Sequence, residues 1–246
     1  MSERKRYYSF AANGSAFGGF LTSPTYLAIP TQAMASLSPS GGYGTASTDN
    51  FGIPGVLSVR TATTTVQGDG KQTEMTVSLE DVNLMDVLKV SRMVVHLVSQ
   101  PDPAGRETLV TPAGSLIEGL TIYGKELPLR SAVETFAKYP TYTGLEYAYV
   151  EGALKGLIIE PGTLGAPCTA KEMGGCVTPI GDVKATLYPE ANGMRIKDFA
   201  TLYLGEYRIS RYARRLTMLR VELGCDTEGS LSLGDGAGNG HWEPPN

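Results

Sequence analysis

The chain has 246 residues, a formal net charge of −4, and 41% hydrophobic residues. The negative balance excludes a general attraction to nucleic acid, and the apolar content is enough for a buried core. Residues 7–48 contain no Asp, Glu, Lys or Arg but many apolar side chains, which excludes a charged disordered tail. Prolines interrupt this segment and it has no run of about 18 apolar residues, so we expect no membrane span.

Short β patterns separated by Gly, Pro, Asn and Asp dominate the rest of the chain. Residues 56–66 alternate and are rich in β-branched side chains, and they end at a turn-like Gln-Gly-Asp-Gly at 67–70. Residues 73–79 would return from that turn. Similar strand patterns occupy residues 87–98, 116–129, 196–209 and 216–223. We therefore predict an all-β fold, a β-sandwich or barrel. A short β-solenoid is the alternative, because 116–129 and 196–209 share one pattern.

One segment has a helical pattern. In residues 131–139, Ser131 is the expected N-cap, Glu134 completes a capping box, and Pro140 ends the helix. We expect a single domain over residues 7–230, with a subdivision near 130–145 as the alternative. Flexible termini are expected at residues 1–6 and 231–246, the latter because it is rich in Gly and Pro.

Four stretches of the first half resemble bacterial choice-of-anchor domains: residues 13–19 (Asn-Gly-Ser-Ala-Phe-Gly-Gly), 53–65, 82–88 and 115–124. The resemblance covers about residues 10–130 and implies a β-rich exported module that is extracellular or on the cell surface. It implies no catalytic residue. The basic start is not followed by the apolar run of a secretory signal peptide. A cytoplasmic or virion-assembled protein is therefore the alternative.

Two clusters suggest ligand binding. The ring faces of Tyr139, Tyr142, Tyr147 and Tyr149 suit sugar stacking or a protein interface, and packing in a half-buried strand is the alternative. The guanidinium groups of Arg208, Arg211, Arg214 and Arg215 suit carboxylates, sulfates or phosphates, and a solvated face with local salt bridges is the alternative. In one continuous strand, Arg208 and Arg214 would share a face, with Arg211 and Arg215 on the other.

Metal and disulfide candidates are few. Asp235 and Asn239, in a Gly-rich tail, are reminiscent of a calcium-binding turn, and the acidic residues near Asp81 are a second calcium candidate; polar turns are the alternative. We expect no other cofactor. Cys168 and Cys176 flank seven residues and are a disulfide candidate that would indicate an oxidising compartment, whereas unpaired thiols would suit the cytosol. The sequence contains none of the common nucleophile, phosphate-loop or zinc-protease motifs.

These observations favour a non-enzymatic, exported structural or adhesive module that self-associates as a homo-oligomer or mediates surface contacts. The uncharged segment at 7–48 motivates this hypothesis, because strands without charge do not repel their copies. The alternative is a protein that binds or processes a glycan, such as a cell-surface ligand, on the same scaffold. Exposure of the tyrosine cluster in a groove would favour the glycan, and burial of the cluster would favour assembly.

Overall fold

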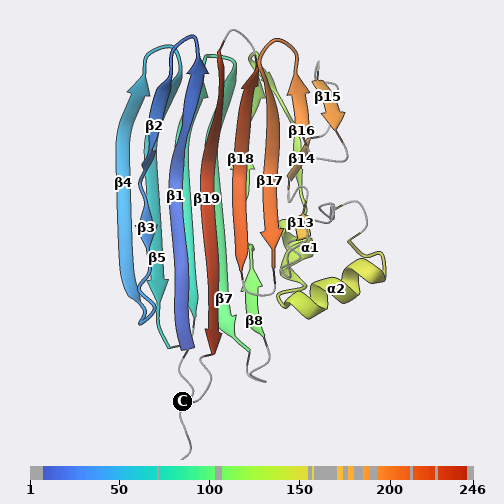
Figure 1. The fold of residues 1–246 in the computed structure, drawn as a ribbon. Coiled ribbons are helices and arrows are strands. Elements are labelled where there is room, and N and C mark those ends of the chain that lie inside the picture. Colours follow the sequence, from blue (N-terminus) through green and yellow to red (C-terminus); the bar gives the residue numbers. More distant parts are fainter. Residues whose placement is uncertain are drawn as a thin grey trace, which may run out of the picture.

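The computed structural model describes residues 8–70, 72–102, 107–154, 157, 171–173, 177–179, 185–188, 193–210, 213–224 and 227–242. Two antiparallel sheets, one of nine strands and one of eight, pack face to face in this part of the chain (Figure 1). The prediction of an all-β sandwich is therefore confirmed. In the residues described, no helix is long and apolar enough to cross a membrane.

The nine-stranded sheet joins the two ends of the chain. Its order is β15-β16-β17-β18-β19-β1-β2, with β13 beside β17 and β3 beside β1. β1 therefore lies between β2 and the last strand, β19. The strands of this sheet are β1 (Tyr8–Ser23), β2 (Leu27–Gln32), β3 (Ala35–Ser36), β13 (Lys171–Met173), β15 (Ala185–Tyr188), β16 (Gly193–Ile196), β17 (Ala200–Ile209), β18 (Arg214–Gly224) and β19 (Glu228–Trp242).

The eight-stranded sheet is built from consecutive hairpins. Its order is β11-β10-β7-β6-β5-β4, and β8 and β9 also pair with β7. These strands are β4 (Gly42–Ile53), β5 (Leu57–Gly68), β6 (Thr73–Leu84), β7 (Leu88–Pro101), β8 (Thr108–Thr111), β9 (Leu116–Glu118), β10 (Thr121–Ile122) and β11 (Lys125–Glu126). A separate pair is formed by β12 (Leu129–Ser131) and β14 (Val177–Pro179).

The inward and outward alternation of side chains reverses once along the long strands of both sheets. In β5, for example, Val59 and Ala62 are both buried. They are three residues apart, and in a regular strand this spacing would place them on opposite faces. At the reversal, every second strand carries a residue with a left-handed backbone, which locally breaks the pleat. These residues are Asn50 (φ 51°) in β4, Asp81 (φ 51°) in β6, Gly205 (φ 62°) in β17 and Gly234 (φ 62°) in β19.

Two short helices lie at one side of the sandwich (Figure 1), where the sequence predicted one. α1 spans Val133–Ala137, and its N-cap is Ala132 rather than Ser131. α2 spans Tyr142–Val150 and was not predicted. Thr141 is the N-cap of α2, because its hydroxyl oxygen accepts a hydrogen bond of 3.0 Å from the backbone N–H of Gly144.

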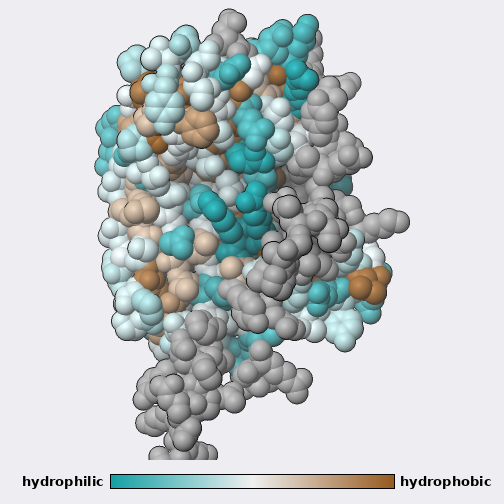
Figure 2. Space-filling view, in the orientation of Figure 1, coloured by the Kyte–Doolittle hydropathy of each residue, from teal (hydrophilic) through white to brown (hydrophobic). Residues whose placement is uncertain are grey.

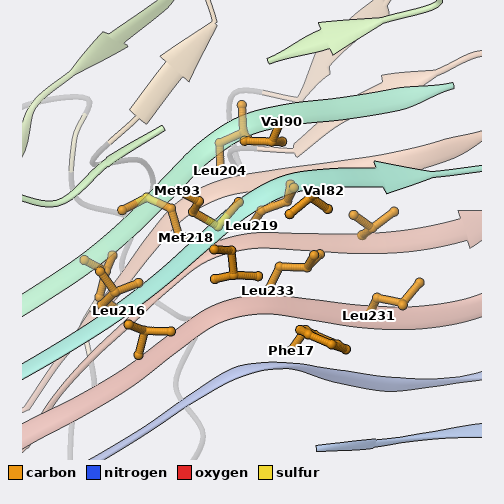
Figure 3. Close-up of a cluster of buried hydrophobic side chains, with 14 of the residues drawn as sticks. Phe17, Val82, Val90, Met93, Leu204, Leu216, Met218, Leu219, Leu231 and Leu233 are labelled. Atoms are coloured by element: carbon orange, nitrogen blue, oxygen red, sulfur yellow. The ribbon is translucent and has the colours of Figure 1, made fainter. Parts of the chain in front are cut away.

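The core fills the space between the two sheets. Figure 3 shows Leu231 and Leu233 of β19 beside Phe17 of β1, with Met218 of β18 near Met93 of β7. All five of these side chains are almost completely buried. Strands that are distant in the sequence therefore depend on one another for burial of their apolar faces.

The last described strand is part of this core, so the prediction of a flexible terminus was wrong for residues 231–242. Residues 231–242 belong to β19, which pairs with β18 on one side and β1 on the other. The glycines that suggested a loose tail face the second sheet at close range. A Cβ on Gly236 would lie 2.0 Å from Cε of Met75, and one on Gly14, its partner in β1, would lie 2.8 Å from Cγ2 of Val77. At these two positions glycine is present because the sheets leave no room for a side chain.

Candidate functional site

The uncharged segment forms one lateral edge of the sandwich. It supplies β1, β2, β3 and the first part of β4. β2 is the last strand of one sheet and β4 the last strand of the other, and both lie on the same side of the molecule (Figure 1). β1 is an interior strand, and burial explains the lack of charge on its inner face but not at its exposed positions, such as Ala11 and Asn13. Burial also does not explain the lack of charge in β2 and in residues 42–48 of β4.

This edge also exposes apolar and aromatic groups. Of the eight large hydrophobic side chains that are exposed in the described residues, five belong to the uncharged segment: Phe20, Tyr26, Leu27, Met34 and Tyr43. In Figure 2, hydrophilic residues gather in a band along the middle of the visible face, while the region on the β1 and β2 side is mostly pale or brown. The edge therefore differs in chemistry from the face beside it.

β4 is the least protected of the edge strands in the described part of the chain. It has 12 residues, against 6 in β2, 4 in β15 and 2 in β11. Natural sheets protect their edges with short strands, prolines, lysines or bulges. β2 contains Pro30, whereas β4 contains no proline and no basic residue, and its one charged residue is Asp49. Only the left-handed Asn50 interrupts β4, which leaves residues 43–49 as a regular strand.

Contacts on its inner face hold β4 in place. Thr48 donates a hydrogen bond of 3.3 Å from Oγ1 to Oε1 of Gln32 at the end of β2. The ring of Phe51 meets that of Phe17 edge-on, with centroids 4.9 Å apart. On the outer face, Tyr43, Thr45, Ser47 and Asp49 are all exposed. β4 is thus a fixed strand whose outer edge has no neighbour among the described strands.

The tyrosine cluster does not form a groove. Tyr142 is buried, and Tyr139 and Tyr149 are half-buried and pack against the core. Only Tyr147 is exposed, at 67%. The reason is that the segment from Tyr142 is a helix, so positions 142, 145 and 148 turn inward and 147 turns outward. Of the four tyrosines expected to bind a glycan, Tyr147 alone is thus mostly exposed.

The arginine cluster is divided differently from the prediction. Arg208 in β17 lies directly opposite Arg215 in β18, and both are exposed. Arg214 faces inward and is 3% exposed. The prediction that Arg208 and Arg214 share a face was wrong, because one strand ends at Ile209 and an antiparallel strand begins at Arg214. Arg211 lies outside the described residues.

Arg214 packs against the helical side of the molecule. Its guanidinium lies over the ring of Tyr142 at 5.9 Å, and Nη1 donates to the carbonyl oxygen of Ser210. Burial lowers the pKa of Arg214 below its usual value, and the nearby Tyr207 and Glu107 oppose that shift. Buried in this way, Arg214 connects β18 to α2.

The structure does not bring Asp235 and Asn239, the residues of the predicted calcium turn, together. Asp235 accepts two hydrogen bonds from Arg215, of 2.8 Å from Nε and 2.5 Å from Nη2, and one of 2.8 Å from Oγ1 of Thr217. Asn239 lies four residues further along the same strand, a distance of about 13 Å, so the two cannot share one ion. Glu80 and Asp81 pair with Arg60. No cluster of three or more potential metal-binding side chains occurs among the described residues.

A second ion-pair network occupies the same outer face. Arg220 donates to both oxygens of Glu206, at 2.7 and 2.8 Å, and stacks over the ring of Tyr203 at 3.6 Å from its centroid. Hydrogen bonding to Glu206 is the main reason why the pKa of Arg220 is raised. The hydroxyl of Tyr203 donates to Glu222 over 3.2 Å. Burial and the Glu222 carboxylate raise the pKa of Tyr203. Arg215 and Arg220 thus bind carboxylates of the protein itself.

A hollow of about 640 Å³ lies beside these networks, over the β1, β19 and β18 region. Its lining consists mainly of small side chains: Ala11, Asn13, Ala213, Arg214, Ala237, Gly238 and Asn239. Among these described residues there is no aromatic ring, which would stack on a sugar, and no carboxylate, which would cleave one. The disulfide candidates Cys168 and Cys176 lie outside the described residues.

These features define an antiparallel β-sandwich with one long uncharged edge. A family model described as Domain of unknown function (DUF8256) matches residues 8–156, which is more than half of the chain, and the protein therefore belongs to that family. The match runs from β1 through α2 and includes the whole of the uncharged edge. No curated protein and no solved structure matches the chain. The resemblance to choice-of-anchor domains stays a prediction.

Proposed function

We propose that this protein is a non-enzymatic structural or adhesive module that associates with a second copy of itself through β4. The observation that carries the proposal is the strand itself. It is a 12-residue edge strand with one charged residue at the end of an eight-stranded sheet, and no described strand covers it. Such an edge presents a row of backbone donors and acceptors that another strand can satisfy.

The lack of charge indicates a copy of the same chain as the partner. An interface between identical copies with twofold symmetry brings the same patch of each copy together. A charged edge would then face its own charge and repel it. Residues 42–48 of β4 have no charged side chain, so two copies can approach without this cost.

The remaining surface supports a structural role over an enzymatic one. The two outer-face networks bind Arg215 to Asp235 and Arg220 to Glu206, so these groups stabilise the sheet. The tyrosines expected to bind a glycan mostly pack inward. Self-association through β4 uses backbone groups and needs none of these side chains.

A surface or extracellular location is part of the same proposal and has its own test. It is supported by the resemblance to exported domains and by the spacing of Cys168 and Cys176. Peptide mass mapping without reduction, on protein isolated from its native host, should recover a peptide pair joined through these two residues. Free thiols at both positions would argue for a reducing compartment.

A matched pair of variants tests the edge. Ser47 in β4 lies directly opposite Thr63 in β5, and both point to the outer face of the same sheet. Ser47→Lys places a charge on the edge, whereas Thr63→Lys adds the same charge one strand further in. Light scattering should show that Ser47→Lys weakens association by at least about tenfold, equivalent to about 1.4 kcal/mol. Thr63→Lys should associate like the wild type. Equal behaviour of the two variants would contradict the proposal.

A further inference from the structure

The geometry of β4 points to one arrangement of the two copies: we infer that they join as an antiparallel β4–β4 pair with Ala46 on the twofold axis. This inference rests on the proposed function and specifies its partner strand and register. It would make one continuous sheet from the eight-stranded sheets of the two copies.

Symmetry restricts the pairing. Two copies of one edge strand that extend a sheet are related by an axis perpendicular to that sheet, which makes the strands antiparallel. This axis keeps each side chain on its own side of the sheet. Directly opposite residues point to the same side. Two directly opposite residues must therefore both have odd numbers or both have even numbers. In such a pairing, one residue always lies opposite its own copy.

The left-handed Asn50 selects one residue for the axis. At Asn50, with φ 51°, the inward and outward alternation of β4 reverses, and the regular strand covers residues 43–49. Only one of the allowed registers pairs all seven of these residues. It places the middle residue, Ala46, opposite Ala46 of the second copy. Tyr43 then faces Asp49 of the second copy, and Thr45 faces Ser47 of the second copy.

The single charge on the edge favours the same register. With Ala46 on the axis, the two copies of Asp49 lie six residues apart along the strand pair, about 20 Å. This exceeds the screening length of about 8 Å in physiological salt, so the two carboxylates do not repel each other appreciably. Moving the axis toward Asp49 would bring the two carboxylates together and extend the pairing across the irregular residue 50.

Two single-cysteine substitutions test the register. Thr45 and Ser47 are both exposed on the outer face, so neither change disturbs the core. In the inferred pair, Thr45 and Ser47 of opposite copies have Cβ atoms about 4.5–5.5 Å apart, close enough for a disulfide after small adjustments. Two copies of Thr45, or two of Ser47, lie on a diagonal at about 7–8 Å. We therefore expect a mixture of Thr45→Cys and Ser47→Cys to form a linked 45–47 pair several times more readily than either variant alone.

The readout separates the register from the proposed function. Mass mapping of linked peptides distinguishes a 45–47 bond from any bond made by the three native cysteines, and Thr63→Cys in β5 is the control that should not link across copies. A dominant 45–45 or 47–47 bond would overturn the register and keep the β4 edge as the interface. No bond at all, in protein that sedimentation shows to be a dimer, would overturn the β4 pairing but not self-association. A protein that stays monomeric would overturn both.

Discussion

Adding one methyl group at Gly236 should destabilise the protein, although the same change usually stabilises a strand. Gly236 lies in the middle of β19 and faces Met75 of the opposite sheet. An ideal Cβ at this position would lie 2.0 Å from Cε and 2.7 Å from Sδ of Met75. Contacts between carbon atoms are normally about 3.5–4.0 Å, so Met75 must move. Met75 is fully buried, and its neighbours limit that movement.

Two opposing effects determine the magnitude. Alanine in place of glycine in a strand gains about 0.5–1 kcal/mol, because it lowers the conformational entropy of the unfolded chain. Overpacking of a closely packed core costs about 1–3 kcal/mol. Since the displaced atoms belong to the flexible end of a methionine, we expect a net loss of about 1–2 kcal/mol for Gly236→Ala in the free energy of unfolding.

The matched control is Gly238→Ala, two residues further along the same strand and on the same face. Its Cβ would meet Leu97 at 3.6 Å, an ordinary contact, so this change should be neutral or slightly stabilising. Urea unfolding followed by circular dichroism measures both variants. Met75→Ala combined with Gly236→Ala should lose at least about 1 kcal/mol less than the sum of the single changes, because the methyl group then has space. If Gly236→Ala were as stable as the wild type, the close approach of β19 to Met75 would be refuted.

Three further predictions concern α2, the surface ion pairs and acid stability. Thr141→Ala should lower the free energy of unfolding by about 1 kcal/mol, because it removes the N-cap of α2; an unchanged urea midpoint would contradict that assignment. Arg220→Met should cost about 1–3 kcal/mol, because the half-buried Glu206 loses its cation, and thermal unfolding that matches the wild type would count against this network. The pKa of Asp86 lies below its usual 3.8, chiefly through the Asn83 hydrogen bond and then through Lys89. The ionised Asp86 therefore stabilises the folded state above its usual pKa, and this stabilisation is lost as the pH falls through the lower pKa of the folded state. Asp86→Asn should thus lose less stability in acid than the wild type. If the variant and the wild type lost equal stability in acid, the contacts of Asp86 with Asn83 and Lys89 would not contribute to acid stability.

The hairpins of the eight-stranded sheet were predictable because their signals are local. Residues 56–66 and 73–79 alternate, carry β-branched side chains and flank a glycine-containing turn, and the structure forms β5 and β6 there. Even here the alternation predicts one continuous face, whereas Val59 and Ala62 both face inward. The reversal depends on left-handed residues in neighbouring strands, which a single strand pattern does not reveal.

The nine-stranded sheet was harder to predict because it depends on interactions between segments that are distant in the sequence. β19 consists largely of glycine alternating with small polar residues, which is typical of a loose tail. It is a strand because it pairs with β1 and β18, and its glycines leave space for Met75 and Val95 of the other sheet. The tyrosines of α2 were misread for a related reason, since aromatic residues favour strands unless tertiary contacts decide otherwise.

The candidate edge was only half visible in the sequence. The absence of charge over residues 7–48 was evident, but the part that remains open depends on the order of the strands. β1 becomes interior because it pairs with β19, more than 200 residues later in the chain. β4 becomes an edge because the eight-stranded sheet ends there.

Sedimentation equilibrium of the wild-type chain over a wide range of concentrations tests self-association through β4 most directly. The monomer has a mass of 26.2 kDa. We predict that the measured mass rises toward twice that value as the concentration increases, and that Ser47→Lys shifts the rise to higher concentration while Thr63→Lys does not. A mass that stays at the monomer value throughout the range would contradict the proposal.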